Sequence, residues 1–141
     1  MTPEAKQKLK NLLVAHEELR NFPYTDTVGC LTIGVGRNLT DRGISNEEAL
    51  ALLNDDIDFF SDKLSHLFGF FDSLSDNRQI ALVDICFNCG LNGFMGFKKM
   101  IEALKSGDYE LASREVLKSR AAEQCPDRYG KLSEIIRTGE M

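Results

Sequence analysis

Apolar residues recur every three or four positions over most of the chain, which is the spacing that places them on one face of a helix. Thr2, followed by Pro3 and Glu4, is typical of a helix start, because threonine caps the first turn and proline fits within it. The pattern therefore predicts a first helix from Thr2 to about Leu19. Its apolar stripe is formed by Ala5, Leu9, Leu12, Leu13, His16 and Leu19.

The helical pattern is interrupted in residues 21–36, where β-type and turn-type residues replace it. The segment 22–24 contains a proline and favours extended backbone, and the segment 27–29 favours a turn. We predict a small β-hairpin here. Gly34 and Gly36 flank a valine, which indicates a close approach of the backbone or a bulge.

The helical pattern returns after the hairpin. Ser45 and Glu48 have the spacing of a capping box, so they predict the start of a long helix from Asn46 to about Leu67. A further helix, capped by Ser75 and apolar on nearly every face, is expected to be central and buried. Glycine, proline and capping residues bound the helices predicted at 75–90, 95–106, 109–118 and 126–138.

These elements place the chain in the α+β class, with a hairpin segregated from a mainly helical part. We expect one domain over residues 1–141, because this length is common for a single domain with its own core. The hairpin lobe would cover about 20–45, the helical lobe about 1–19 and 60–141, and the connecting helix about 46–67. Such an arrangement predicts a cleft between the two lobes.

The composition removes several classes of protein. Hydrophobic residues make up 43% and charged residues 28% of the chain, values ordinary for a globular protein. The net charge of -5 argues against nucleic-acid binding, which requires clustered Lys and Arg. Residues 2–13 lack the apolar run of a signal peptide or anchor, so we expect cytoplasmic synthesis and no stable membrane insertion.

The cysteines leave two alternatives open, a disulfide or a metal site. Cys86 and Cys89 have C-x-x-C spacing, but no second pair follows, and the two histidines have no ligand spacing. We therefore expect free thiols at these positions and at Cys30 and Cys125, with no metal and no cofactor.

Three residues around the hairpin could carry chemistry. Glu17 ends the first predicted helix, Asp26 follows nine positions later, and Thr32 follows six positions after that. Hydrolysis of a glycosidic bond needs one acid to protonate the leaving oxygen and a second carboxylate on the other face of the sugar. Spacing alone is a weak signal, because such pairs often occur by chance on solvated surfaces.

The segment from Glu17 to Gly36 resembles the signature of glycoside hydrolase family 24, the phage-type lysozymes. That signature is a Glu, eight residues, an Asp, five residues, a Thr and then Ile-Gly-x-Gly. The resemblance covers nearly the whole chain, and it implies a lysozyme-like fold. Later segments that resemble the family in the same order are Phe87-Asn88-Cys89-Gly90, Gly96-Phe97, Lys118-Ser119-Arg120, Gln124-Cys125-Pro126-Asp127-Arg128 and Arg137-Thr138-Gly139.

The resemblance implies hydrolysis of peptidoglycan at the β-1,4 bond from N-acetylmuramic acid to N-acetylglucosamine, with inversion. Glu17 would be the general acid, and Asp26 with Thr32 would position the attacking water. It also implies that Arg128 faces Glu17 across the cleft. The residues implied to bind substrate are Asn88, Phe87, Gln124, Arg128 and Arg120.

The sequence departs from the family at two informative positions. Glu18 stands where the family commonly has Gly, and Arg37 stands where it commonly has His. In the family that His pairs with an Asp, whose matching position is Asp56, so we predict an ion pair between Arg37 and Asp56.

The resemblance leaves the biological setting as an expectation. We expect a monomeric phage or prophage endolysin that lyses its host, made in the bacterial cytoplasm and acting on the periplasmic cell wall after release through a separate pore. One alternative is a peptidoglycan-binding protein that has lost catalysis on the same fold. Another is an enzyme that cleaves chitin with the same carboxylates.

Overall fold

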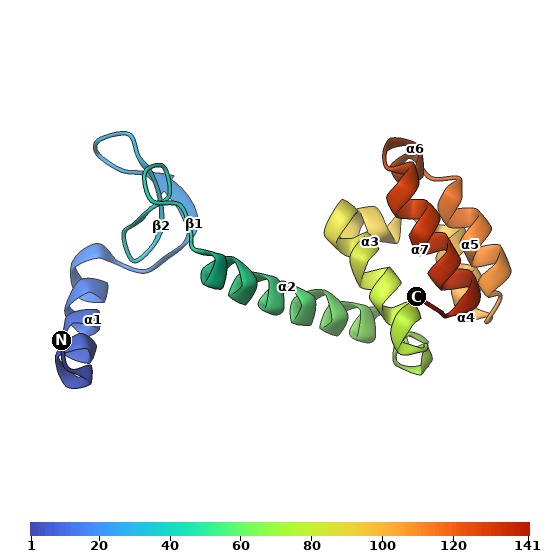
Figure 1. Ribbon diagram of the computed structural model, residues 1–141, viewed down its shortest axis with the longest axis horizontal. Coiled ribbons are helices and arrows are strands. Elements are labelled where there is room, and N and C mark those ends of the chain that lie inside the picture. Colours follow the sequence, from blue (N-terminus) through green and yellow to red (C-terminus); the bar gives the residue numbers. More distant parts are fainter. The chain divides into compact units, whose positions relative to one another are not determined.

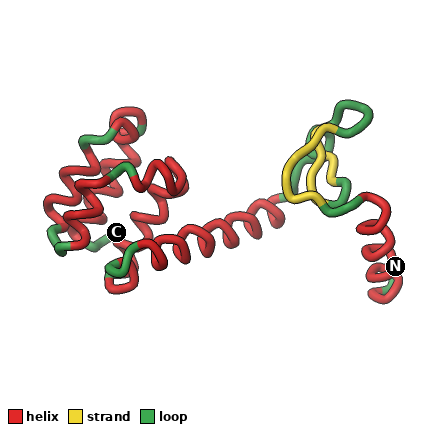
Figure 2. Tube along the Cα trace, turned by 180° about the vertical axis from the view of Figure 1, so that it is seen from behind, coloured by secondary structure: helices red, strands yellow, loops and turns green.

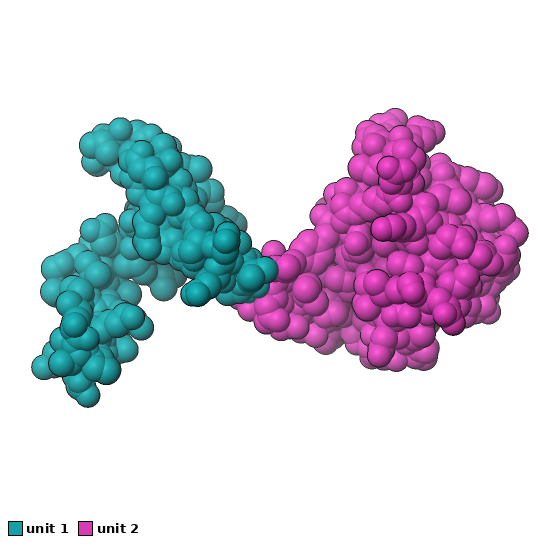
Figure 3. All heavy atoms as spheres, in the orientation of Figure 1, with its two compact units in different colours: residues 1–52 teal, residues 53–141 magenta.

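The computed structural model describes all 141 residues as two compact units, Met1–Leu52 and Leu53–Met141 (Figure 3). Seven α-helices accompany one small antiparallel sheet, so the predicted α+β class is confirmed (Figures 1 and 2). The first helix belongs to the same unit as the sheet. Its predicted assignment to the helical lobe, and the predicted cleft, stay predictions.

Unit 1 begins with α1 (Pro3–Glu17), which starts where the sequence predicts. The Thr2 hydroxyl caps it by accepting a hydrogen bond from the Ala5 N–H at 3.1 Å. The helix ends two residues earlier than predicted, because Glu18 leaves the helical conformation at φ 62° and ψ 150°. No residue of α1 is buried, so its apolar stripe is not covered by the sheet of its own unit.

The sheet of unit 1 has the strand order β1 (Arg20–Thr25), β2 (Leu31–Gly34) and β3 (Arg37–Asn38), all antiparallel (Figure 2). It contains the predicted hairpin, β1 and β2. The third strand was not predicted, because two residues are too short to show an alternating pattern. The central strand carries Thr32, which pairs with Tyr24 on one side and Asn38 on the other.

The long helix α2 (Asn46–Leu67) has the bounds that the sequence predicts and leads from unit 1 into unit 2. Its capping box is formed in both directions. The Ser45 N–H donates to Glu48 Oε1 at 3.0 Å, and the Glu48 N–H donates to Ser45 Oγ at 3.1 Å. Both bonds are local in sequence, which explains why the start of this helix was predictable.

Unit 2 is a cluster of helices (Figure 1), and α3 (Asp76–Met95) contributes five buried apolar side chains to its core. As predicted, the first part of α3 stops at Gly90, with φ 70° and ψ 173°, and a short continuation follows to Met95. Against it packs α7 (Pro126–Thr138), and α5 (Tyr109–Leu117) and α6 (Arg120–Gln124) pack against α7. Helix α4 (Lys98–Lys105) packs against α5, and the short helix η1 (Phe71–Ser73) precedes α3.

None of the helices has, by itself, both the length and the apolar composition of a membrane span. Helices α3 and α4 reach those values only when they are joined, and the chain bends by 97° between them.

The conformation of Glu18 predicts a stabilising substitution. Its φ of 62° and ψ of 150° lie in a region that glycine adopts freely and other residues adopt only with strain. Glu18→Gly is expected to raise the free energy of unfolding by about 1 kcal/mol, the relieved strain exceeding the entropy cost of glycine. Urea denaturation measures this change in the free energy of unfolding. Glu18→Ala is the control, because it removes the same carboxylate and keeps the strain; equal stability of the two variants would contradict this account.

The start of α2 predicts a pH dependence. Hydrogen bonds from Arg37, and then from the Ser45 backbone and hydroxyl, lower the pKa of Glu48 from 4.5 to about 2. A depressed carboxyl pKa stabilises the fold above the unfolded-state pKa, and this contribution is lost as the pH falls toward 2. The urea midpoint of the native protein should therefore exceed that of Glu48→Gln at about pH 5, and the two should converge near about pH 2. A constant difference would show that Glu48 contributes nothing through its charge.

Candidate active site

Asp26 is held in place by the turn that joins β1 to β2. Its carboxylate oxygen Oδ1 accepts hydrogen bonds from the backbone N–H groups of Val28 at 3.0 Å and Cys30 at 2.8 Å. The backbone closes the same turn, because the Asp26 N–H donates to the Cys30 carbonyl at 2.9 Å. Both hydrogen bonds of the side chain use Oδ1, so Oδ2 is available to a ligand.

Thr32 lies beside this turn on β2 and is 4% exposed. Its hydroxyl donates to the Cys30 carbonyl at 3.0 Å. Since the single hydroxyl proton is used in this bond, the oxygen can act toward a further ligand only as an acceptor. Asp26 Oδ2 and Thr32 Oγ1 are thus two acceptors, held by the main chain of one residue, Cys30.

Glu17 is the last residue of α1, and its carboxyl lies against the turn between β2 and β3. Unit 1 therefore contains all three residues predicted to be catalytic. Each comes from a different segment: a helix end, a hydrogen-bonded turn and a central strand. The separation of the two carboxylates that inversion requires stays a prediction.

Arg37 forms its ion pair with Glu48, at 2.5 Å between NH2 and Oε2, and donates to the Gly43 carbonyl. Asp56, the predicted partner, belongs to unit 2, so that pair stays a prediction. Glu48 and Asp56 are eight residues, or about 12 Å, apart along α2, which means that one guanidinium engages one of them at a time. The sequence signal that could have pointed to Glu48 was its place in the capping box. This box holds Glu48 at the start of α2, where its carboxylate meets Arg37 of β3.

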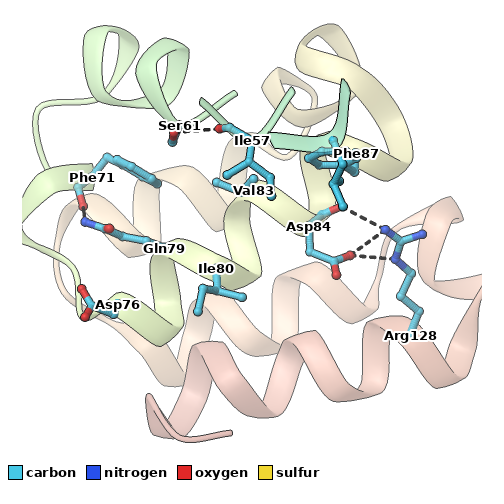
Figure 4. A pocket seen from close by; sticks show the side chains of 11 residues that line it. Ile57, Ser61, Phe71, Asp76, Gln79, Ile80, Val83, Asp84, Phe87 and Arg128 are labelled. Atoms are coloured by element: carbon cyan, nitrogen blue, oxygen red, sulfur yellow. Dashed lines mark hydrogen bonds and ion pairs between the residues drawn. The ribbon is translucent and has the colours of Figure 1, made fainter. Parts of the chain in front are cut away.

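Two of the predicted substrate-binding residues line one pocket of unit 2. Phe87 on α3 and Arg128 on α7 both border a pocket of about 510 Å³ (Figure 4). Arg128 is fixed by Asp84, because its Nε donates to Oδ1 at 2.7 Å and its NH2 to the Asp84 carbonyl at 3.2 Å. The apolar part of the wall consists of Leu53, Ile57, Phe71, Ile80, Val83 and Phe87.

Asn88 is oriented by a buried tyrosine. The Tyr129 hydroxyl donates to Asn88 Oδ1 at 2.7 Å, and the ring of Tyr129 is fully buried. Burial, and then the neighbouring Cys89, raise the pKa of Tyr129, so its hydroxyl keeps its proton and remains a donor. The carbonyl of the Asn88 amide is therefore occupied and its NH2 group is available. The other two predicted residues, Arg120 and Gln124, are exposed at the two ends of α6.

Sequence reasoning missed Asp84 and Tyr129, which position Arg128 and Asn88. Both lie on helices whose apolar spacing was used only to define the core. Tyr129 interrupts a polar stretch directly after Arg128, and that isolated aromatic was the one signal that could have pointed to it.

An α+β fold with a glutamate at a helix end, a second carboxylate in a rigid turn and a buried threonine beside that turn agrees with the class expected from the sequence, a glycosidase of the lysozyme class. The family model described as phage lysozyme matches residues 14–128. The chain belongs to the phage lysozyme family, as its resemblance predicted, and this membership implies a peptidoglycan substrate.

Individual relatives agree with this membership. The protein named Probable T4-type lysozyme 1 of Dictyostelium discoideum is 22% identical over 94% of this chain and 95% of its own length. The Endolysin of Bacillus phage B103 is 32% identical over 77% of this chain and 42% of its own length. The pre-baseplate central spike protein of Enterobacteria phage T4 is 29% identical over 94% of this chain. The chain spans only 28% of that spike protein.

The hydrogen bonds of Asp26 predict that two substitutions differ in stability. Asp26→Asn keeps an oxygen that can accept from Val28 and Cys30, so the free energy of unfolding should change by less than about 0.5 kcal/mol. Asp26→Ala leaves both N–H groups without this acceptor and should lower it by about 1–2 kcal/mol. Urea denaturation of both variants provides the comparison. Equal losses would mean that these two bonds do not stabilise the turn.

Proposed function

We propose that this chain hydrolyses the β-1,4 bond from N-acetylmuramic acid to N-acetylglucosamine in peptidoglycan, with inversion at the anomeric carbon. The observation that carries the proposal is the pair of acceptors at Asp26 Oδ2 and Thr32 Oγ1. A water that donates one hydrogen to each of them has its lone pairs directed away from both, toward a bound sugar. An inverting glycosidase requires a water held in this way and a separate acid, and the groups of unit 1 could supply both.

The reaction follows from these roles. Glu17, in its protonated form, gives its proton to the glycosidic oxygen while the bond from that oxygen to the anomeric carbon breaks. The water attacks the anomeric carbon from the opposite face, and its proton passes to Asp26. Thr32 orients the water and gains no proton. Inversion requires about 6.5–9.5 Å between the two carboxyl groups, because the water must fit between Asp26 and the sugar.

The residues of unit 2 would bind the glycan strand. Arg128 is already fixed by Asp84, so its charged N–H donors would lose little side-chain conformational entropy when they bind a sugar. The NH2 group of Asn88 is free to donate as well. Phe87 supplies an apolar surface, while Arg120 and Gln124 add exposed polar groups on α6. We place the enzyme, as a monomer without a cofactor, in phage-mediated lysis, where it reaches the cell wall through a separate pore. The endolysin relative supports this setting.

The test is to incubate the purified chain with peptidoglycan and with chitin and to identify the sugar at each new reducing end. The proposal requires N-acetylmuramic acid at the new ends, and NMR of the first product should show the inverted anomer. N-acetylglucosamine ends, or cleavage of chitin alone, would contradict the proposed bond. Cleavage of neither polymer would leave a binding protein on the same fold.

Glu17→Gln is expected to lower kcat by about 10²–10⁴-fold, because the amide cannot supply the proton. Glu18→Gln is the matched control, since it removes the adjacent charge and should retain activity. Both are measured on peptidoglycan after their folding is checked by circular dichroism. Retained activity in Glu17→Gln together with loss in Glu18→Gln would assign the acid to Glu18 instead.

A further inference from the structure

The turn between β2 and β3 lies directly against the carboxyl group of Glu17. This turn consists of Val35 and Gly36, and Gly36 has a φ of +70°. A Cβ atom placed on Gly36 would lie 3.2 Å from Glu17 Oε2 and 3.4 Å from both Cδ and Cγ. The distance to Oε2 is shorter than an ordinary van der Waals contact, and the other two lie at its lower limit. A side chain at this position would therefore shift the carboxyl of Glu17 by a few tenths of an ångström.

No other restraint on this carboxyl exists within unit 1. Glu17 is exposed, and none of the hydrogen bonds or ion pairs of the unit includes its side chain. A free glutamate at a helix end would sample several rotamers. Catalysis by a general acid requires the carboxyl to be in one place, and a displacement of about 1 Å can cost about 10²-fold in rate.

We infer that Gly36 is a positioning residue for Glu17, whose carboxyl is located by contact with the bare backbone of the β2–β3 turn. The inference rests on the proposed function for its catalytic consequence. Gly36 follows Thr32 by four residues along the same hairpin. The acid and the acceptors for water are therefore located by one small sheet, although α1 carries the acid.

Gly34 provides a matched control. It has the same φ of +70° as Gly36, but no atom lies within 4 Å of a Cβ placed on it. Alanine at either position should destabilise the backbone by a similar free energy, since both positions must adopt a left-handed conformation. Only alanine at position 36 meets Glu17.

The experiment compares Gly36→Ala with Gly34→Ala on soluble peptidoglycan fragments of defined length. Both variants should lower the urea midpoint to a similar extent. Gly36→Ala should lower kcat by about 10–100-fold with KM changed less than about twofold, whereas Gly34→Ala should retain most of kcat. Equal kcat values for the two variants would overturn the inference.

A second variant tests whether the effect passes through Glu17. In Glu17→Asp the carboxyl is shorter by one methylene, so the close approach of 3.2 Å at Oε2 is removed and only contacts of about 3.4 Å, an ordinary van der Waals distance, remain. Adding Gly36→Ala to Glu17→Asp should then cost no more activity than adding Gly34→Ala does. A full additional loss in the Glu17→Asp background would mean that Gly36 acts on something other than Glu17.

The position of the carboxyl can also be followed without activity. With ¹³C-labelled glutamate, the Glu17 side-chain carboxyl resonance should shift in Gly36→Ala and stay in place in Gly34→Ala. An unchanged resonance in both variants would refute the inference whatever the enzyme cleaves. Conversely, failure of the native protein to cleave peptidoglycan, with the shift observed, would refute the proposed function and leave the positioning contact standing.

Discussion

The backbone of Cys30 holds together the segment of unit 1 that contains two of the candidate catalytic residues, Asp26 and Thr32. Its N–H donates to the Asp26 carboxylate, and its carbonyl accepts from both the Asp26 N–H and the Thr32 hydroxyl. These bonds close the β1–β2 turn and at the same time determine which oxygens of Asp26 and Thr32 are free. The turn and the two candidate side chains are therefore coupled through the two peptide groups that flank one residue, Cys30.

The two units locate their candidate residues by different means. In unit 1 Asp26 and Glu17 are located by backbone groups, through the Cys30 bonds and the contact with Gly36. In unit 2 Arg128 and Asn88 are located by other side chains, since Asp84 fixes Arg128 and Tyr129 fixes Asn88. Side chains that hold other side chains can be replaced singly, so the arrangement in unit 2 is more open to change than the one in unit 1.

How much of the structure could be predicted from the sequence depended on how far apart along the chain the interacting residues lie. The capping box of α2, the cap of α1 and the break at Gly90 were predictable because each is made within a few residues. The early end of α1 was missed because helical spacing continued past Glu18, whose conformation is non-helical. Asp84 and Tyr129 were missed because their partners lie more than 40 residues away. The prediction of Glu17, Asp26 and Thr32 as catalytic residues came from the family pattern, since their spacing alone carried little information.

The turn from Asp26 to Cys30 has one more consequence. The hydrogen bonds that Asp26 makes in this turn all join it to main-chain groups, and the Val28 side chain is 80% exposed. The side chains at the tip can therefore diversify without removing the bonds that order Asp26. In evolutionary terms, such a loop separates two kinds of selection, one that acts on the backbone holding the carboxylate and one that acts on the outer surface.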